Sequence, residues 1–244
     1  MRAEGSTGPG GESWSPRTAV VWSVLSAELR RAARPDGAGA QLRVVDVGGG
    51  TGGFAVPLAE LGHRVTVVDP SPDALATLDR RASAAGVADR ITAVQGDSDT
   101  LASMVPPGSA DLVLCHSLLE VVEDPAATLA AVAAMLPPGG LLSVLVANRA
   151  AAVLSRALGG HFADAERALT DPEGRWGEGD GATRRFDAEG LQVLIAASGL
   201  VVEQLHGVRV VADLVPGAVA DVAGETLVGV ELALAGRAPY RDIA

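Results

Sequence analysis

Short apolar runs alternate along the chain with longer segments whose apolar positions recur at helical spacing. The runs are nearly all Val, Ile and Leu, and they lie at Leu42–Val47, Arg64–Val68, Ile91–Val94, Leu112–Cys115 and Leu141–Ala147. The helical segments between them are Gly52–Leu61, Pro72–Ala85, Ser98–Met104 and Pro125–Leu136. Apolar strands separated by helices are typical of a parallel sheet covered on both faces. The pattern predicts an α/β fold with a doubly wound, mostly parallel sheet.

The amino-terminal segment has a different character. Residues 1–16 are rich in Gly, Ser, Pro and Glu and predict a disordered tail. The next segment, Pro16–Arg34, has apolar residues at helical spacing after a Ser-Pro start signal, which predicts one amphipathic helix. We expect a single domain over residues 17–244.

The alternation breaks after Asn148. Residues 149–185 hold an Ala/Leu/Arg helical stretch and then a polar, Gly-rich segment, 170–183, which predicts a long loop. Such a loop in a compact domain is a functional lid or a disordered connection, so residues 149–185 are expected to be an insertion or lid on the substrate side. A helix at Asp187–Ala197, a β-run at Leu200–Val211 and a helix at Ala218–Ala235 complete the expected fold.

Charge and cysteine content restrict the possible partners. The net charge is -11, and the 19 basic residues are all Arg and form no strongly basic segment. This balance argues against tight non-specific binding to nucleic acid. A single cysteine, Cys115, favours a reducing compartment and a buried core position. Without a signal-like start or an apolar run long enough for a bilayer, we expect a cytoplasmic protein with no membrane association.

A glycine-rich turn follows the first predicted strand and leads directly into a helix. The run Asp46-Val47-Gly48-Gly49-Gly50-Thr51-Gly52-Gly53 includes the spacing G-x-G-x-x-G. Glycines let backbone N–H groups approach a ligand closely, and the helix N-terminus adds positive potential. The candidate cofactor-binding residues here are Asp46, Gly48, Gly49, Gly50 and Gly52. On its own this motif is shared with dinucleotide-binding proteins.

Acidic residues end the next two predicted strands. Asp69 ends the second, where a carboxylate can accept hydrogen bonds from a ribose diol, and Pro70 follows it. A helix-capping role is the alternative for Asp69, although Ser71 can take that role. Asp97 and Ser98 end the third strand and suit an adenine amino group, with helix capping as the alternative reading. These four residues complete the predicted nucleoside site together with the glycines.

The combination of motifs resembles the class I S-adenosylmethionine-dependent methyltransferases. It comprises the acidic, Gly-rich first loop, Asp69, Asp97 and the turn Pro137-Pro138-Gly139-Gly140 before the fifth strand, and the resemblance covers roughly residues 18–235. It implies a Rossmann-like sheet of seven strands with one antiparallel strand. It also implies S-adenosylmethionine as cofactor, S-adenosylhomocysteine as product, and no metal.

A closer resemblance is to the tRNA 5-carboxymethoxyuridine methyltransferases, which esterify a carboxylate on a modified wobble uridine. It rests on stretches beginning at His116, Val146, Gly207 and Ala238. Transferred by position, His116, Asn148 and Arg209 become the candidate catalytic residues, and His116 also lies beside the cofactor. The acceptor would be a small molecule or a modified tRNA. Arg149, Arg184 and Arg185 are further candidates for orienting a carboxylate.

The sequence departs from that family in two ways, and the roles of His116 and Arg209 and the catalytic activity are each open to alternatives. Ala163–Arg185 contains six acidic residues and four Arg, where the family insertion is Lys-rich, and the chain stops at Ala244, where we expect a closing β-strand to follow. His116 is either a base for a hydroxyl acceptor, a wall of the site or a histidine satisfied by backbone. Arg209 either binds an acceptor anion or pairs with a carboxylate such as Asp213. A cofactor-binding homologue without catalytic activity is the alternative to an enzyme.

Overall fold

The structure, a computed structural model, describes residues 15–32, 41–98, 100–182, 184–215 and 217–244, with backbone alone for 217–221. Most of the predicted tail, residues 1–14, lies outside these ranges. The chain divides into two compact units. The sheet unit comprises residues 40–146 and 194–201, and the helical unit comprises residues 1–39, 147–193 and 202–244.

The sheet unit is built on five parallel strands in the order β3-β2-β1-β4-β5. They are β1 (Arg43–Val47), β2 (Arg64–Asp69), β3 (Ile91–Gln95), β4 (Leu112–His116) and β5 (Leu141–Leu145). All adjacent pairs are parallel, and Val47 lies opposite both Val68 and Cys115 in the register. The carboxyl ends of β1, β2 and β4 therefore meet at one edge of the sheet, as the sequence predicted.

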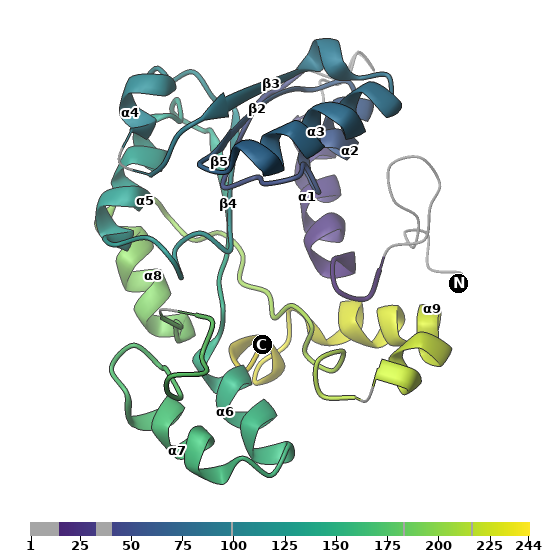
Figure 1. Cartoon of the computed structure of the whole chain (residues 1–244), viewed down its shortest axis with the longest axis vertical. Coiled ribbons are helices and arrows are strands. Elements are labelled where there is room, and N and C mark those ends of the chain that lie inside the picture. Colours follow the sequence, from purple (N-terminus) through teal and green to yellow (C-terminus); the bar gives the residue numbers. More distant parts are fainter. Residues whose placement is uncertain (1–14, 33–40, 99, 183, 216) are drawn as a thin grey trace. The chain divides into compact units, whose positions relative to one another are not determined.

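Helices connect these strands as the apolar spacing predicted. They are α2 (Ala55–Glu60), α3 (Pro72–Ala84), the 3-10 turn η1 (Ala88–Arg90), α4 (Leu101–Met104) and α5 (Pro125–Ala134). Ser71 starts α3 by accepting a hydrogen bond from the Ala74 amide at 3.2 Å, and Asp124 starts α5 in the same way. In Figure 1, α2 and α3 lie to one side of the sheet and α4 and α5 to the other.

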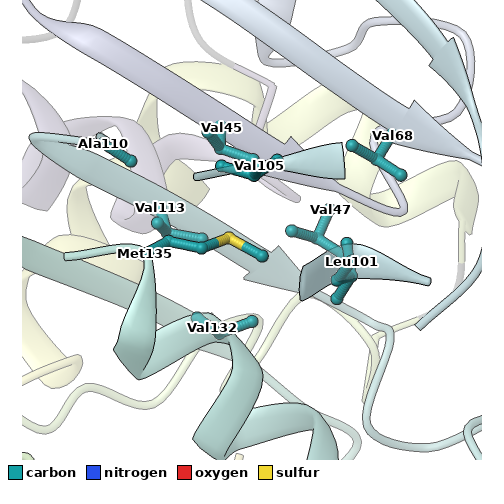
Figure 2. Close-up of a cluster of buried hydrophobic side chains, with 9 residues drawn as sticks. All are labelled: Val45, Val47, Val68, Leu101, Val105, Ala110, Val113, Val132 and Met135. Atoms are coloured by element: carbon teal, nitrogen blue, oxygen red, sulfur yellow. The ribbon is translucent and has the colours of Figure 1, made fainter. Parts of the chain in front are cut away.

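Between the sheet and α4 and α5 lies a cluster of buried apolar side chains, shown in Figure 2. Val45, Val47 and Val113 project from the strands, because alternate residues of a strand face the same side. Leu101, Val132 and Met135 meet them from the helical layer. Each such side chain contributes about 1.5–3 kcal/mol on burial, which fixes the strands whose ends carry the candidate site.

The helical unit contains α1 (Ala19–Ala32), α6 (Arg149–Leu158), α7 (Phe162–Thr170), α9 (Gly217–Leu234) and the 3-10 turn η2 (Tyr240–Asp242). Within it, α1 packs against α9 and α6 against α7. A further helix, α8 (Ala188–Ala197), begins in this unit, and its last residues belong to the sheet unit. No helix in the described ranges is long and apolar enough to cross a bilayer.

The prediction of seven strands was wrong for the part of the chain that the structure describes, which holds five parallel strands. The expected β-run Leu200–Val211 is irregular chain ending in a turn. There, the amides of Val210 and Val211 donate to the side chain of Glu231 instead of a neighbouring strand. At this end of the segment, a side chain about 20 positions away thus takes the hydrogen bonds that a sheet partner would need. The single-domain boundary and the insertion role of residues 149–185 stay predictions.

Candidate functional site

The glycine-rich loop between β1 and α2 is shaped by left-handed backbone. Gly48, Gly50 and Gly52 have φ angles of 73°, 54° and 79°, which residues with a Cβ rarely adopt. At Gly52 a Cβ would also lie 2.3 Å from Cδ1 of the buried Leu78. The sequence therefore forms here an open turn whose backbone can approach a ligand.

Asp46, a predicted cofactor residue, lies beneath this loop with 3% of its surface exposed. A Cβ on Gly49 would come within 2.6 Å of the Asp46 carboxylate, so the missing side chain makes room for it. The Oδ2 atom of Asp46 has no hydrogen-bond partner among the described residues. Burial, and then the charge of Asp69, raises the pKa of Asp46 to about 7. This position supports the loop from below, and direct contact of Asp46 with a cofactor stays a prediction.

Asp69 is the last residue of β2 and connects the loop to the next helix. Its Oδ2 accepts from the Gly50 amide at 2.9 Å, and its Oδ1 accepts from the Ser71 amide at 2.9 Å. Ser71 caps α3 as expected, but Asp69 is not left free of the backbone. Each carboxylate oxygen has two lone pairs, so Asp69 can still accept from a ribose hydroxyl at the loop.

Asp97 follows β3 and makes the helix-capping type of contact that was the alternative for it. Its Oδ1 accepts from the Thr100 amide at 3.1 Å and from the Thr100 hydroxyl at 2.8 Å, just before α4. Its side chain is exposed at the same sheet edge as Asp69. The Gly96 amide donates to the Asp69 carbonyl at 3.2 Å, so the ends of β2 and β3, which Pro70 and Ser98 follow, lie side by side.

His116 is the last residue of β4, and its pKa has the largest shift among the described histidines. Its Nε2 lies 2.8 Å from the Ser143 hydroxyl, and its ring meets Phe54 edge-on with centroids 4.8 Å apart. The Nδ1 atom is buried and has no hydrogen-bond partner among the described residues. Burial lowers the pKa of His116 to about 4, so the ring is neutral at pH 7. A histidine that acts as a base for a hydroxyl acceptor would have a pKa near the working pH. His116 does not have such a pKa.

Asn148 and Arg209 belong to the helical unit, so the pocket expected between them and His116 stays a prediction. Asn148 caps α6: its Oδ1 accepts from the Ala151 amide at 3.0 Å, and its Nδ2 donates to the Asp242 carbonyl at 3.2 Å. Arg209 lies on an exposed turn with a φ of 66°, not in a β-run. Its Nε donates to Asp213 at 2.8 Å, which is the ion pair weighed as the alternative role.

The other arginine candidates differ in how their charge is balanced. Arg185 is buried and makes a two-armed ion pair with Asp180, at 2.6 and 2.8 Å, and its guanidinium stacks on Trp176. Arg184 pairs with Glu173 at 3.1 Å. Arg149 donates to the Pro172 carbonyl and has no carboxylate partner in the described chain. Arg149 is therefore the candidate whose charge remains available to an acceptor.

Sequence reasoning missed two neighbours of His116. Ser143 lies within the apolar strand β5 and contacts the histidine ring, and Phe54 comes from the end of the glycine loop. A hydroxyl in an otherwise apolar strand was a usable signal for Ser143. Phe54 carried no comparable signal, because an aromatic residue at a helix start is unremarkable in sequence.

Two simple chemistries find no support among the described residues. They contain no group of three or more His, Cys, Asp and Glu side chains that could hold a metal ion. Cys115 is buried, as expected, and burial raises the pKa of its thiol to about 12, so it is not a nucleophile at neutral pH.

Comparison with known proteins agrees with this arrangement. Residues 44–140, which carry the glycine loop, Asp69, Asp97 and His116, match the family described as Methyltransferase domain. This part of the chain is therefore similar to a methyltransferase domain. A SAM-dependent methyltransferase structure from Methanosarcina mazei shares the fold at a TM-score of 0.52, with 20% identity over 65% of this chain and 79% of that chain.

Particular relatives are methyltransferases of two kinds. The tRNA 5-carboxymethoxyuridine methyltransferase of Escherichia coli K12 is 32% identical over 60% of this chain and 54% of its own length. The ubiquinone biosynthesis O-methyltransferase of Xanthomonas campestris pv. campestris is 39% identical over 48% of this chain and 48% of its own length. The chain spans about half the length of these curated relatives.

Proposed function

We propose that this protein is an S-adenosylmethionine-dependent methyltransferase acting on a carboxylate of a small molecule or a modified tRNA uridine. The observation that carries the proposal is the contact between the Gly50 amide and the Asp69 carboxylate. It joins a left-handed glycine loop to an acidic strand end at the carboxyl edge of a parallel sheet, the region where open α/β sheets bind ligands. The match of residues 44–140 to a methyltransferase domain favours this cofactor over a dinucleotide.

The residues at this edge fit the cofactor. Asp69 would hold the ribose hydroxyls, and Asp97 and Ser98 the adenine amino group. The Gly48, Gly50 and Gly52 amides already donate within the protein, so the amides of Gly49 and Thr51 would bind the amino-acid part. A Cβ at Gly52 or Gly49 would come within 3 Å of buried side chains beneath the loop, so the loop can pack this closely on the sheet unit only with glycine at these positions. When bound, the sulfonium supplies an already activated methyl group, and the protein's task is to align the acceptor and exclude water.

The chemistry of His116 supports an acceptor that needs no base. A general base works best when its pKa lies near the working pH, and burial has lowered the pKa of His116 to about 4. A ring this weakly basic removes a proton from an alcohol or phenol poorly. A carboxylate is already ionised at neutral pH, so His116 would serve it as a wall and hydrogen-bonding group, held by Ser143.

An anionic acceptor requires a cation, and the helical unit supplies two candidates. Arg149 follows the capping residue Asn148, and its side chain donates to the Pro172 carbonyl and to no other group among the described residues. Arg209 would have to exchange Asp213 for the acceptor, which an exposed ion pair permits at low cost. That the segment 149–185 faces the acceptor stays a prediction, made from its place after the fifth strand.

The test is methyl transfer from labelled cofactor to three fractions: cellular RNA, small acids and protein. We expect label in RNA or in small acids, in a base-labile ester. Arg149→Ala and Arg209→Ala should each reduce transfer at least tenfold while cofactor affinity stays within about twofold, because the lost contacts belong to the acceptor. Arg80→Ala, on the exposed side of α3, is the matched control with unchanged transfer.

Two results would contradict the proposal. Cofactor binding without transfer to any fraction would make the chain a non-catalytic homologue. Transfer to a hydroxyl would remove the carboxylate acceptor. If the pH profile of that transfer rate also has an inflection at low pH that shifts in His116→Asn, His116 acts as a base.

A further inference from the structure

A cavity lies at the amino-terminal edge of the sheet, the edge opposite the one that carries the glycine loop. It has a volume of about 250 Å³ and is lined by residues of β1, β2 and β3 and by the segment from Met104 to Ser109. The glycine loop follows the carboxyl end of β1, so the cavity and the loop lie at opposite ends of the strands. All its lining residues belong to the sheet unit.

The strand register brings three arginines into one row along this cavity. Arg43 starts β1 and lies opposite Arg64, which starts β2. Arg90 directly precedes Ile91, whose register partner Val65 directly follows Arg64. All three arginines line the cavity. Like charges side by side on a sheet are destabilising unless something balances them, and the chain as a whole carries a net charge of -11.

The three guanidinium groups are balanced unequally. Arg43 makes a two-armed ion pair with Asp111, at 2.7 and 3.1 Å. Arg64 donates to the neutral Gln41 Oε1 at 3.3 Å, and Arg90 to the Ala59 carbonyl at 3.2 Å. Asp89 is the carboxylate within the cavity lining, and no ion pair joins it to either arginine. Arg64 and Arg90 thus keep N–H donors that no carboxylate occupies in the described chain.

Two hydroxyl groups complete the donor set. Thr66 and Thr92 are register partners on β2 and β3, each two residues beyond an arginine of the row. Both line the cavity, and neither hydroxyl has a hydrogen-bond partner in the part of the chain that the structure describes. Met104, Val105 and Pro106 form an apolar wall beside them. Met104 is the last residue of α4, a helix of four residues.

From this arrangement we propose that the cavity is a second binding site, which takes a small phosphate ester. Arg64 and Arg90 would bind the phosphate oxygens through charge-assisted hydrogen bonds, and Thr66 and Thr92 would donate to the same group. The apolar wall would cover the organic part of the ester. Because the site lies at the strand end away from the cofactor loop, its ligand is not the methyl acceptor.

Calorimetry with inorganic phosphate and with glycerol 3-phosphate tests the proposal on the full chain at constant ionic strength. We expect both to bind, the ester more tightly, whereas chloride at the same ionic strength releases no binding heat. Arg64→Gln and Arg90→Gln should each weaken binding about tenfold or more, and Thr66→Val by a smaller factor. Arg80→Gln removes one charge from the same unit outside the cavity and should leave the affinity unchanged.

Folding and cofactor binding are controlled separately in each variant. S-adenosylhomocysteine affinity should stay at the wild-type value, which shows that the sheet unit is intact. Equal phosphate affinity in Arg64→Gln and wild type would overturn the proposal. A second result would also overturn it: tRNA binds in a way that depends on Arg64, but free phosphate and the ester do not bind. The row of arginines would then contact a nucleic-acid backbone.

Discussion

Two irregular backbone segments in this protein are each held by a carboxylate from elsewhere in the chain, but the two carboxylates are placed differently. Asp69 accepts from the Gly50 amide at the edge of the sheet, beside a loop that a ligand can approach. Glu231, which is fully buried, accepts from three successive amides, those of Val210, Val211 and Ala212. The first carboxylate has lone pairs to share with a ligand, and the second is committed to structure.

Removing the structural carboxylate should have the largest effect. Glu231→Ala leaves three backbone amides without their acceptor, two of them on Glu231 Oε1. We expect a loss of about 3–5 kcal/mol in the free energy of unfolding, measured by urea titration. Glu231→Gln keeps one acceptor oxygen and should lose less. A loss below about 1 kcal/mol in Glu231→Ala would show that water satisfies these amides.

The glycine loop should respond strongly to a single methyl group. Gly52→Ala combines a positive φ with a Cβ 2.3 Å from Leu78, so we expect a loss of about 2–4 kcal/mol. Gly86→Ala is the matched control, because it has a φ of 71° and nothing within 4 Å of its Cβ. It should lose only the conformational part, about 1–2 kcal/mol. Equal losses in urea unfolding would remove the packing argument at Gly52.

Asp46 makes a prediction about pH. Its pKa is raised to about 7 in the folded chain from 3.8, so the folded state keeps a proton that the unfolded state has lost. Stability should therefore fall as pH rises between about 4 and 7, by up to about 3 kcal/mol. Asp46→Asn should remove this slope, so its stability relative to wild type is greater at pH 8 than at pH 5. Parallel pH profiles for the two proteins would contradict the raised pKa.

The smallest effect on stability is expected at the exposed pair Arg209–Asp213. Both side chains are about two-fifths exposed, at 43% and 39%, so solvent screens their interaction. Asp213→Asn should change the free energy of unfolding by less than about 1 kcal/mol. If Arg209 binds the acceptor anion, the same change should lower the KM for that acceptor. An unchanged KM would show that Asp213 does not compete with the acceptor.

The same contrast explains what could be predicted from sequence. The five strands and the glycine loop were predictable because apolar runs, a Gly-rich turn and Asp69 are close in sequence or at a characteristic spacing. The segment 200–211 was predicted as a strand from its apolar residues alone. The amides of its last two residues, Val210 and Val211, donate to Glu231, and no local signal in 200–211 identifies that partner.

The candidate site was predictable in its positions and less so in its chemistry. Asp69 and His116 lie at strand ends as expected, because strand ends follow from strand positions. The low pKa of His116 depends on burial and on Ser143 from another strand, which sequence does not show. The ion pair of Arg209 with Asp213 was one of the two roles expected for Arg209, and the structure has it.

Calorimetric titration with S-adenosylhomocysteine tests most directly the claim that Asp69 is the ligand-sharing carboxylate. Wild type should bind it and should not bind NAD. Asp69→Ala should weaken binding by about 1–3 kcal/mol, or roughly 5- to 150-fold. Glu231→Gln, which changes the committed carboxylate, should bind as wild type does. Wild-type affinity in Asp69→Ala, or preferential binding of NAD, would contradict the account.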